Sequence, residues 1–136
     1  MKPSGSGIGI LTEQKMAFKL NRNQKEAIAR YLEILSQIYR EQISKVILFG
    51  SVARGDFSPE SDIDLLIVTA NGGQNLKDEI SMACFDMMLE TEVILSPLGM
   101  DEETYEWHKK YRDPLYNQIQ KDGIDLWMNK NLSRQG

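Results

Sequence analysis

Residues 46–68 of this chain read VILFGSVARGDFSPESDIDLLIV, and this stretch decides the fold. The first apolar run ends at Gly50 and Ser51, and ten residues later Asp62 and Asp64 open a second apolar run. Continuous apolar runs of this length predict two buried strands, 45–50 and 62–69. Carboxylates at alternate positions of a strand point to the same face, about 6.6 Å apart along it. We therefore expect the two aspartates to stand together where the second strand begins.

Paired carboxylates at the start of an apolar strand favour a divalent cation site. Hard cations such as Mg²⁺ take oxygen ligands and keep positions open for phosphate oxygens. Unpartnered carboxylates would be costly to bury, and a bound metal removes that cost. The alternative interpretation of Asp62 and Asp64 is a polar strand start that faces solvent. The Gly-Ser turn at the matched spacing favours the metal site, because Gly50 permits close backbone approach to a ligand and Ser51 offers a hydroxyl.

The pattern of Gly-Ser, ten residues and Asp-x-Asp resembles the signature of the DNA polymerase β-like nucleotidyltransferases. The chain looks most similar to the minimal, stand-alone branch of that superfamily. The resemblance is dense over residues 46–68 and continues more loosely to about residue 126. It implies an α/β (α+β) nucleotidyltransferase fold, with a small mixed β-sheet and helices packed mainly on one face. It also implies transfer of a nucleoside monophosphate, most often AMP from ATP, to a hydroxyl acceptor with release of pyrophosphate.

The resemblance implies contacts to the triphosphate from the turn and the loop after it. Gly50 and Ser51 correspond to the family's Gly-Ser turn and are predicted to contact phosphate oxygens. Arg54 is either a bidentate phosphate ligand or a solvated helix residue. Ser61 either contacts a phosphate or closes the loop before the second strand, and we favour the loop.

Two-metal chemistry needs a third carboxylate beside Asp62 and Asp64. The family places it on the next strand, which we predict over 91–98, where alternation puts Glu92, Ile94 and Ser96 on one face. Glu92 is therefore the predicted third ligand for Mg²⁺ (or Mn²⁺), although the family usually has Asp at this position. If Glu92 is not a ligand, the protein binds nucleotide without efficient turnover. Three other acids are weaker alternatives: Glu90, Asp86 and Asp101.

The remaining segments read mainly as helices. Apolar side chains at the helical period predict helices over 24–42 and 75–90. Asn23 and Glu26 resemble a capping box for the first of these. Asp101 is predicted to cap a short helix that ends at Lys110. The last helix is expected to start at Asp113-Pro114 and to stop at Gly123.

Length and composition limit the number of domains and the kinds of protein that this chain can be. The chain has 136 residues, which suits one domain over 21–128, with a flexible arm at 1–20 and a frayed tail at 129–136. The net charge of -4 argues against a non-specific nucleic-acid binder. The single cysteine, Cys84, fits a reducing compartment. It is expected on a helix face that packs into the protein core. No apolar run approaches the length of about 20 residues that spans a membrane, so we predict a cytoplasmic protein.

The acceptor must come from outside so short a chain, either from a partner protein or from a homo-oligomer. In the resembling family, minimal nucleotidyltransferases often pair with an all-helical HEPN protein in toxin–antitoxin systems. Three functions therefore stay open: a free enzyme, an antitoxin or partner-binding subunit, and a catalytically weak nucleotide-binding module. Aromatic side chains in the C-terminal third are expected to be mostly packing residues, with a partner surface as the alternative, and His108 is expected on a surface or interface. These aromatic residues are Trp107, Tyr111, Tyr116 and Trp127.

Overall fold

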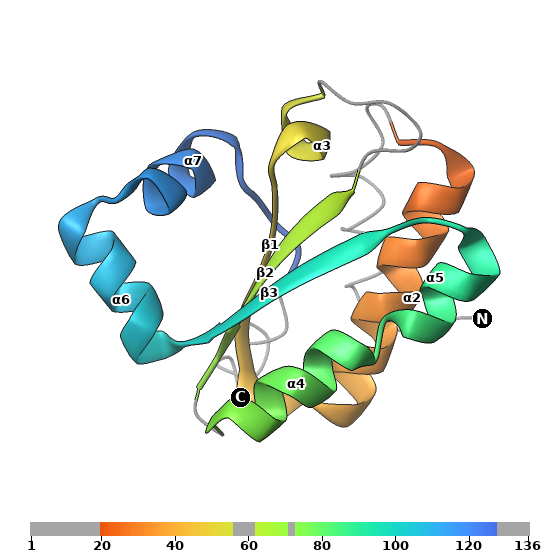
Figure 1. The fold of residues 1–136 in the computed structure, drawn as a ribbon, viewed down its shortest axis with the longest axis horizontal. Helices are drawn as coiled ribbons and strands as arrows, with labels where there is room; N and C mark the ends of the chain where they lie inside the picture. The colour runs from red at the N-terminus through yellow and green to blue at the C-terminus, as the bar shows by residue number, and fades with distance from the viewer. Residues whose placement is uncertain (1–19, 56–61, 71–72, 128–136) are drawn as a thin grey trace, which may run out of the picture.

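The computed structural model describes residues 20–55, 62–70 and 73–127, which form a four-stranded sheet covered by helices (Figure 1). The elements follow one another along the chain as α2 (Arg22–Ile38), η2 (Arg40–Gln42), β1 (Ile43–Phe49), α3 (Ser51–Arg54), β2 (Ile63–Thr69), α4 (Gly73–Met82), α5 (Phe85–Thr91), β3 (Leu95–Asp101), α6 (Glu102–Tyr111), α7 (Pro114–Asp122) and β4 (Ile124–Asp125).

The strands lie in the order β3-β2-β1-β4, and the sheet is mixed. Strands β1 and β2 are antiparallel, with Phe49 opposite Asp64. Strands β2 and β3 are parallel, with Asp64 beside Ser96, and the short β4 pairs antiparallel with β1. The end of β1 and the starts of β2 and β3 therefore meet at one end of the sheet, which we call the Asp64 end. This mixed sheet with its helices confirms the predicted fold class.

The larger core lies between one face of the sheet and helices α2, α4 and α5. Alternate residues of β2 point into it, because successive side chains of a strand face opposite ways. Tyr31 from α2 is fully buried here, and its hydroxyl donates to the carbonyl oxygen of Ile80 at 2.5 Å. Burial raises the pKa of Tyr31 above its ordinary value. The fully buried side chains of this core include Ile28, Leu32, Leu35, Leu48, Ile63, Leu65, Ile67 and Trp127.

The smaller core lies on the opposite face of the sheet, under α6 and α7. Its two tyrosine rings, Tyr105 and Tyr116, meet edge to face with centroids 6.0 Å apart. The other buried members are Ile47, Phe49, Leu66, Val68, Met100 and Ile119. The predicted helical layer on one face corresponds to α2, α4 and α5, while α6 and α7 cover part of the other face (Figure 1).

The predicted start of the first helix was two residues too late. The capping box is formed by Asn21 and Gln24 instead of Asn23 and Glu26. The Gln24 N–H donates to Asn21 Oδ1 at 2.8 Å, and the Asn21 N–H donates to Gln24 Oε1 at 3.0 Å. Both orphan donors at the helix start are then satisfied, which fixes the N-terminus at Arg22.

The predicted helix 75–90 and strand 91–98 were also misplaced. The helix is broken into α4 and α5 near Cys84, which is buried as expected. Helix α5 extends through Thr91, and β3 begins only at Leu95. The reason is local, since the Thr91 hydroxyl donates to the Met87 carbonyl oxygen at 2.5 Å and Glu92 closes the helix in the left-handed conformation with φ 60°.

The predicted ends of the last two helices are confirmed. The Asp101 side chain accepts from the Thr104 N–H at the start of α6, and Asp113 caps α7 by accepting from the Tyr116 N–H, with Pro114 in the first turn. Gly123 ends α7. Within the residues that the structure describes, no helix combines the length and apolar character needed to cross a bilayer. The predicted tail at 129–136 and nearly all of the predicted arm at 1–20 lie outside the described residues.

Candidate active site

The two aspartates stand where the sequence predicted, at the start of β2. Asp62 is exposed and directly precedes the strand, while Asp64 is half-buried and lies within it. Because Phe49 is opposite Asp64 in the antiparallel pair, the next residue of β1, Gly50, passes close to the Asp64 side chain. A Cβ atom built on Gly50 would overlap Asp64 Oδ2. Gly50 also has a positive φ of 84°, which favours glycine. Glycine at position 50 therefore lets the carboxylate lie against the backbone of the turn.

The charges around Asp64 oppose one another. Burial raises the pKa of the Asp64 carboxyl, the negative charge of Asp62 raises it further, and the positive charge of Arg54 lowers it. Two carboxylates that repel each other in a partly desolvated position are an arrangement that a bound cation stabilises. Alternate positions on a strand also put the Asp62 and Asp64 side chains on the same face.

The Gly-Ser turn continues into α3, a single helical turn. Ser51 is half-buried at its start, and Arg54 is exposed at its end. The positive charge of Arg54 lowers the pKa of Asp64 and so opposes the effects of burial and of Asp62. Ser61, the fourth residue predicted to contact phosphate or close the loop, lies outside the described residues.

Glu92 does not lie on a strand. It is the exposed residue that ends α5, three residues before β3 begins. Glu92 was predicted as the third ligand because it would lie on a strand over 91–98, and that strand position is wrong. Its role as a metal ligand stays a prediction without that support.

The residue beside Asp64 on the neighbouring strand is Ser96. Side chains that are neighbours across two parallel strands point to the same face of the sheet. Ile94, just before β3, and Leu98, within it, lie two residues to either side of Ser96 on the same face. Their side chains are 53% and 42% exposed. Sequence reasoning grouped Ile94 and Ser96 on one face but could not align them with Asp64, because no local signal sets the register of two strands separated by about 30 residues.

His108 has a structural partner. Its Nδ1 atom pairs with the Asp113 carboxylate, and its ring meets the Trp107 ring at 5.1 Å between centroids. Since Asp113 also caps α7, this pair ties the end of α6 to the start of α7. Of the four aromatic residues singled out in the sequence, Tyr116 and Trp127 are buried, and Trp107 and Tyr111 are exposed.

The residues present fit one divalent cation. Asp62 and Asp64 supply charged oxygens that repel each other, and the Asp64 carboxylate lies against the Gly50 backbone, where a side chain would overlap it. Among the described residues, no cluster of three His, Cys, Asp or Glu side chains could hold a metal ion. The set therefore suits a cation that completes its coordination with phosphate oxygens.

The sequence of this chain is similar to a known protein family and to proteins of the same kind. A family model described as a nucleotidyltransferase domain matches residues 28–126. A protein of Methanocaldococcus jannaschii, named as a candidate protein adenylyltransferase, is 35% identical over 105 residues, which are 77% of this chain and 99% of that protein. The family match runs from α2 to β4 and includes Gly50, Asp62 and Asp64.

Two solved structures are similar at lower identity. One, described as a candidate minimal nucleotidyltransferase, is 25% identical with a TM-score of 0.49, and the match covers 74% of this chain and 92% of the other. The second, described as a toxin–antitoxin with AMP-PNP, is 19% identical with a TM-score of 0.47, covering 72% of this chain and 71% of the other.

Proposed function

The chain belongs to the nucleotidyltransferase-domain family, and from that premise we propose that it transfers AMP from ATP to a hydroxyl acceptor and releases pyrophosphate. The resemblance carried by residues 46–68 is thereby confirmed at the level of the family. The observation that carries the proposal is the Asp64 carboxylate held against the Gly50 backbone, with the charge of Asp62 beside it.

Asp62 and Asp64 hold the divalent cation, Mg²⁺ or Mn²⁺, that accompanies the triphosphate. When bound, such a cation neutralises the charge that develops on the phosphates and the leaving group. The two carboxylates would thereby define where the phosphates bind, at the start of β2. Asp64 is the more constrained of the two, because the Gly50 turn lies directly behind its carboxylate.

Gly50, Ser51 and Arg54 bind the phosphates from the turn side. The turn at Gly50 brings the backbone close to the Asp64 carboxylate, and the Ser51 hydroxyl donates to a phosphate oxygen. Arg54 ends α3 and its positive charge acts on Asp64, which supports pairing of its guanidinium with a phosphate that the aspartates would otherwise repel. Ser61, which lies outside the described residues, keeps both alternatives, a phosphate contact and a loop residue before β2, and we favour the loop.

The transfer is a single displacement at phosphorus. The acceptor oxygen bonds to the α-phosphorus while the bond from that phosphorus to the oxygen bridging to the β-phosphate breaks. Pyrophosphate leaves with the electrons of that bond, and the acceptor proton passes to water. Positioning and charge stabilisation supply most of the acceleration in chemistry of this kind.

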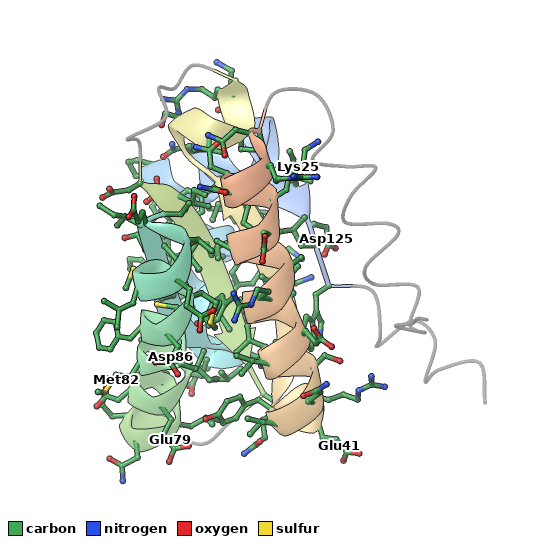
Figure 2. All side chains as sticks on the ribbon, turned by 90° about the vertical axis from the view of Figure 1, so that its right-hand side faces the viewer. Lys25, Glu41, Glu79, Met82, Asp86 and Asp125 are labelled. Carbon is green, nitrogen blue, oxygen red and sulfur yellow. The ribbon has the colours of Figure 1, made fainter. Side chains whose placement is uncertain are left out.

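A protein acceptor or partner is a second part of the proposal. The relative that is 35% identical is named as a candidate protein adenylyltransferase, which supports a protein hydroxyl as acceptor. Exposed apolar side chains at the α4–α5 surface support a partner-binding subunit, such as the antitoxin of a HEPN pair, or a homo-oligomer. Figure 2 shows Met82 at the outer edge of α4, away from α2. The three exposed side chains are Met82, Phe85 and Leu89.

The direct test combines a nucleotide assay with an unfolding measurement. We expect the double variant Asp62→Asn, Asp64→Asn to lose transfer of label from α-labelled ATP in the presence of Mg²⁺ or Mn²⁺ and cell lysate. Its melting temperature should stay equal to or slightly above that of the unchanged chain, because a repulsive pair is removed. Parallel assays with labelled GTP, CTP and UTP report the base preference.

Asp125→Asn is the matched control, because it makes the same chemical change at an exposed carboxylate on β4 (Figure 2). The amide retains the oxygen that accepts from the Trp127 N–H, so this variant should transfer label normally. Transfer that survives in the double variant would refute the proposed function.

A further inference from the structure

The register of β2 and β3 determines which side chain can share a cation with Asp64. Asp64 is beside Ser96, and Leu66 is beside Leu98. Neighbouring strands lie about 4.8 Å apart, so a carboxylate at position 96 could reach the same ion as Asp64. The side chain present is a neutral hydroxyl, which brings no charge to a second cation.

The neighbours of Ser96 on the same face of β3 cannot replace it. Ile94 and Leu98 are both apolar and largely open to solvent. The next residue on that face, Met100, is buried in the smaller core. Thus the face of β3 that continues the Asp62–Asp64 site carries no carboxylate from position 94 to position 100.

The other acids named as candidates are placed elsewhere. Glu92 ends α5, and Glu90 pairs with Arg30 of α2. Asp86 lies in the first turn of α5 (Figure 2). Asp101 caps α6 and is beside Thr69 at the far end of β2, about 16 Å along the strand from Ser96.

We infer that β3 supplies no third carboxylate for a second cation, with Ser96 beside Asp64 at the place where such a group would act, and that the described residues of this chain bind a nucleoside triphosphate with one divalent cation. This inference rests on the proposed function, since it assumes that Asp62 and Asp64 bind the first cation with the triphosphate. Its consequence is chemical. Without a carboxylate on β3, the described residues hold no second cation that would lower the pKa of the acceptor hydroxyl, so we expect the isolated chain to transfer AMP slowly.

The number of bound cations tests this inference without relying on turnover. The full-length chain is saturated with an ATP analogue that carries a methylene bridge between the α- and β-phosphates, and Mn²⁺ binding is titrated by electron paramagnetic resonance. We expect one Mn²⁺ per chain in the unchanged protein and two in Ser96→Asp. Ser96→Asn, which has nearly the same shape without the charge, should stay at one, and so should Glu92→Gln.

The same variants make a second readout. Ser96→Asp should raise the rate of AMP transfer from ATP by at least about tenfold, because an activated acceptor hydroxyl replaces an unactivated one. Ser96→Asn should not. If Ser96→Asp does not fold, Ile94→Asp serves instead, because Ile94 precedes β3 on the same face and its exposed side chain leaves room for the change.

The possible failures are distinguishable. Two Mn²⁺ per chain in the unchanged protein, or a loss of Mn²⁺ in Glu92→Gln, would overturn the inference and leave the proposed function standing. One Mn²⁺ in both Ser96→Asp and Ile94→Asp would also overturn it. Failure of the unchanged chain to bind the analogue at millimolar Mn²⁺ would instead refute the proposed function.

Discussion

The two faces of the sheet differ in function, although the same strands form both. One face packs into the larger core, and the other carries Asp64. On the α2 side, Ile63, Leu65 and Ile67 of β2 are completely buried in the larger core. On the other side, Leu66 and Val68 are buried in the smaller core under α6 and α7, and Asp64 lies half-buried at the start of the strand. Because side chains alternate, a single strand can stabilise the fold through one set of residues and carry chemistry on the other.

The two faces differ in burial at the start of β2 and β3. Ile94 and Leu98 are exposed on the same face as Asp64, whereas Leu95 between them is buried on the α2 side. Asp62 and Ser96 are exposed as well. Changes on the α2 side should act on stability, and changes at the Asp64 end should act on binding.

A leucine pair gives the largest expected contrast. Leu65→Ala removes a fully buried side chain from the larger core and should cost about 2–5 kcal/mol of unfolding free energy, since a cavity remains. Leu98→Ala removes a side chain that is half open and should cost less than about 1 kcal/mol. Urea unfolding monitored by circular dichroism measures both. Equal losses of unfolding free energy in the two variants would show that the two faces do not differ in how they stabilise the fold.

A glycine pair gives the next contrast. Gly50→Ala places a side chain in a left-handed conformation and against Asp64 Oδ2, so we expect a loss of about 1–3 kcal/mol in stability. Binding of ATP with Mg²⁺ should also weaken, since Asp64 is displaced. Gly99→Ala on β3 is the control, because its Cβ would meet only the Lys77 side chain at 3.5 Å. Calorimetric titration of both variants with ATP and Mg²⁺ measures the affinities. Normal ATP affinity in Gly50→Ala would contradict the role given to the contact between Gly50 and Asp64.

A pair of aspartates gives the smallest and most specific contrast, because their pKa values move in opposite directions. The Tyr116 N–H and His108 lower the pKa of Asp113, so the stability that this group contributes is present above its unfolded pKa of about 3.9 and is lost as the pH falls through the folded value. Burial and Asp62 raise the pKa of Asp64, so its contribution is present at low pH and is lost as the pH rises through the folded value.

We therefore expect opposite pH profiles from two neutral variants in the absence of divalent cations. Asp64→Asn should melt slightly higher than the unchanged chain at pH 7, and the difference should vanish as the pH falls below about 4. Asp113→Asn should melt lower at pH 7, with the difference again closing in acid. Differential scanning calorimetry from pH 3 to pH 7 follows both, and profiles of the same sign would contradict the assigned environments.

Much of the candidate site was predictable from local sequence. Gly50, Asp62 and Asp64 were identified because turn chemistry and strand alternation act over a few residues. The ends of α6 and α7 were predictable for the same reason, since Asp101 and Asp113 cap the helices that immediately follow them. Glu92 was misplaced because the residues around it alternate in a way that fits a strand, while the Thr91 hydroxyl and a left-handed residue extend and close a helix.

The sequence by itself determined a mixed α/β fold, two buried strands, a Gly-Ser turn after the first and two aspartates at the start of the second, because each of these rests on patterns of near neighbours in the chain. Only the tertiary structure decided that Gly50 lies against Asp64, that Ser96 is beside Asp64 and that α6 and α7 cover a second core on the other face of the sheet. These features depend on register and packing between distant segments, which are set by the burial of the two cores as a whole and by no single residue pattern.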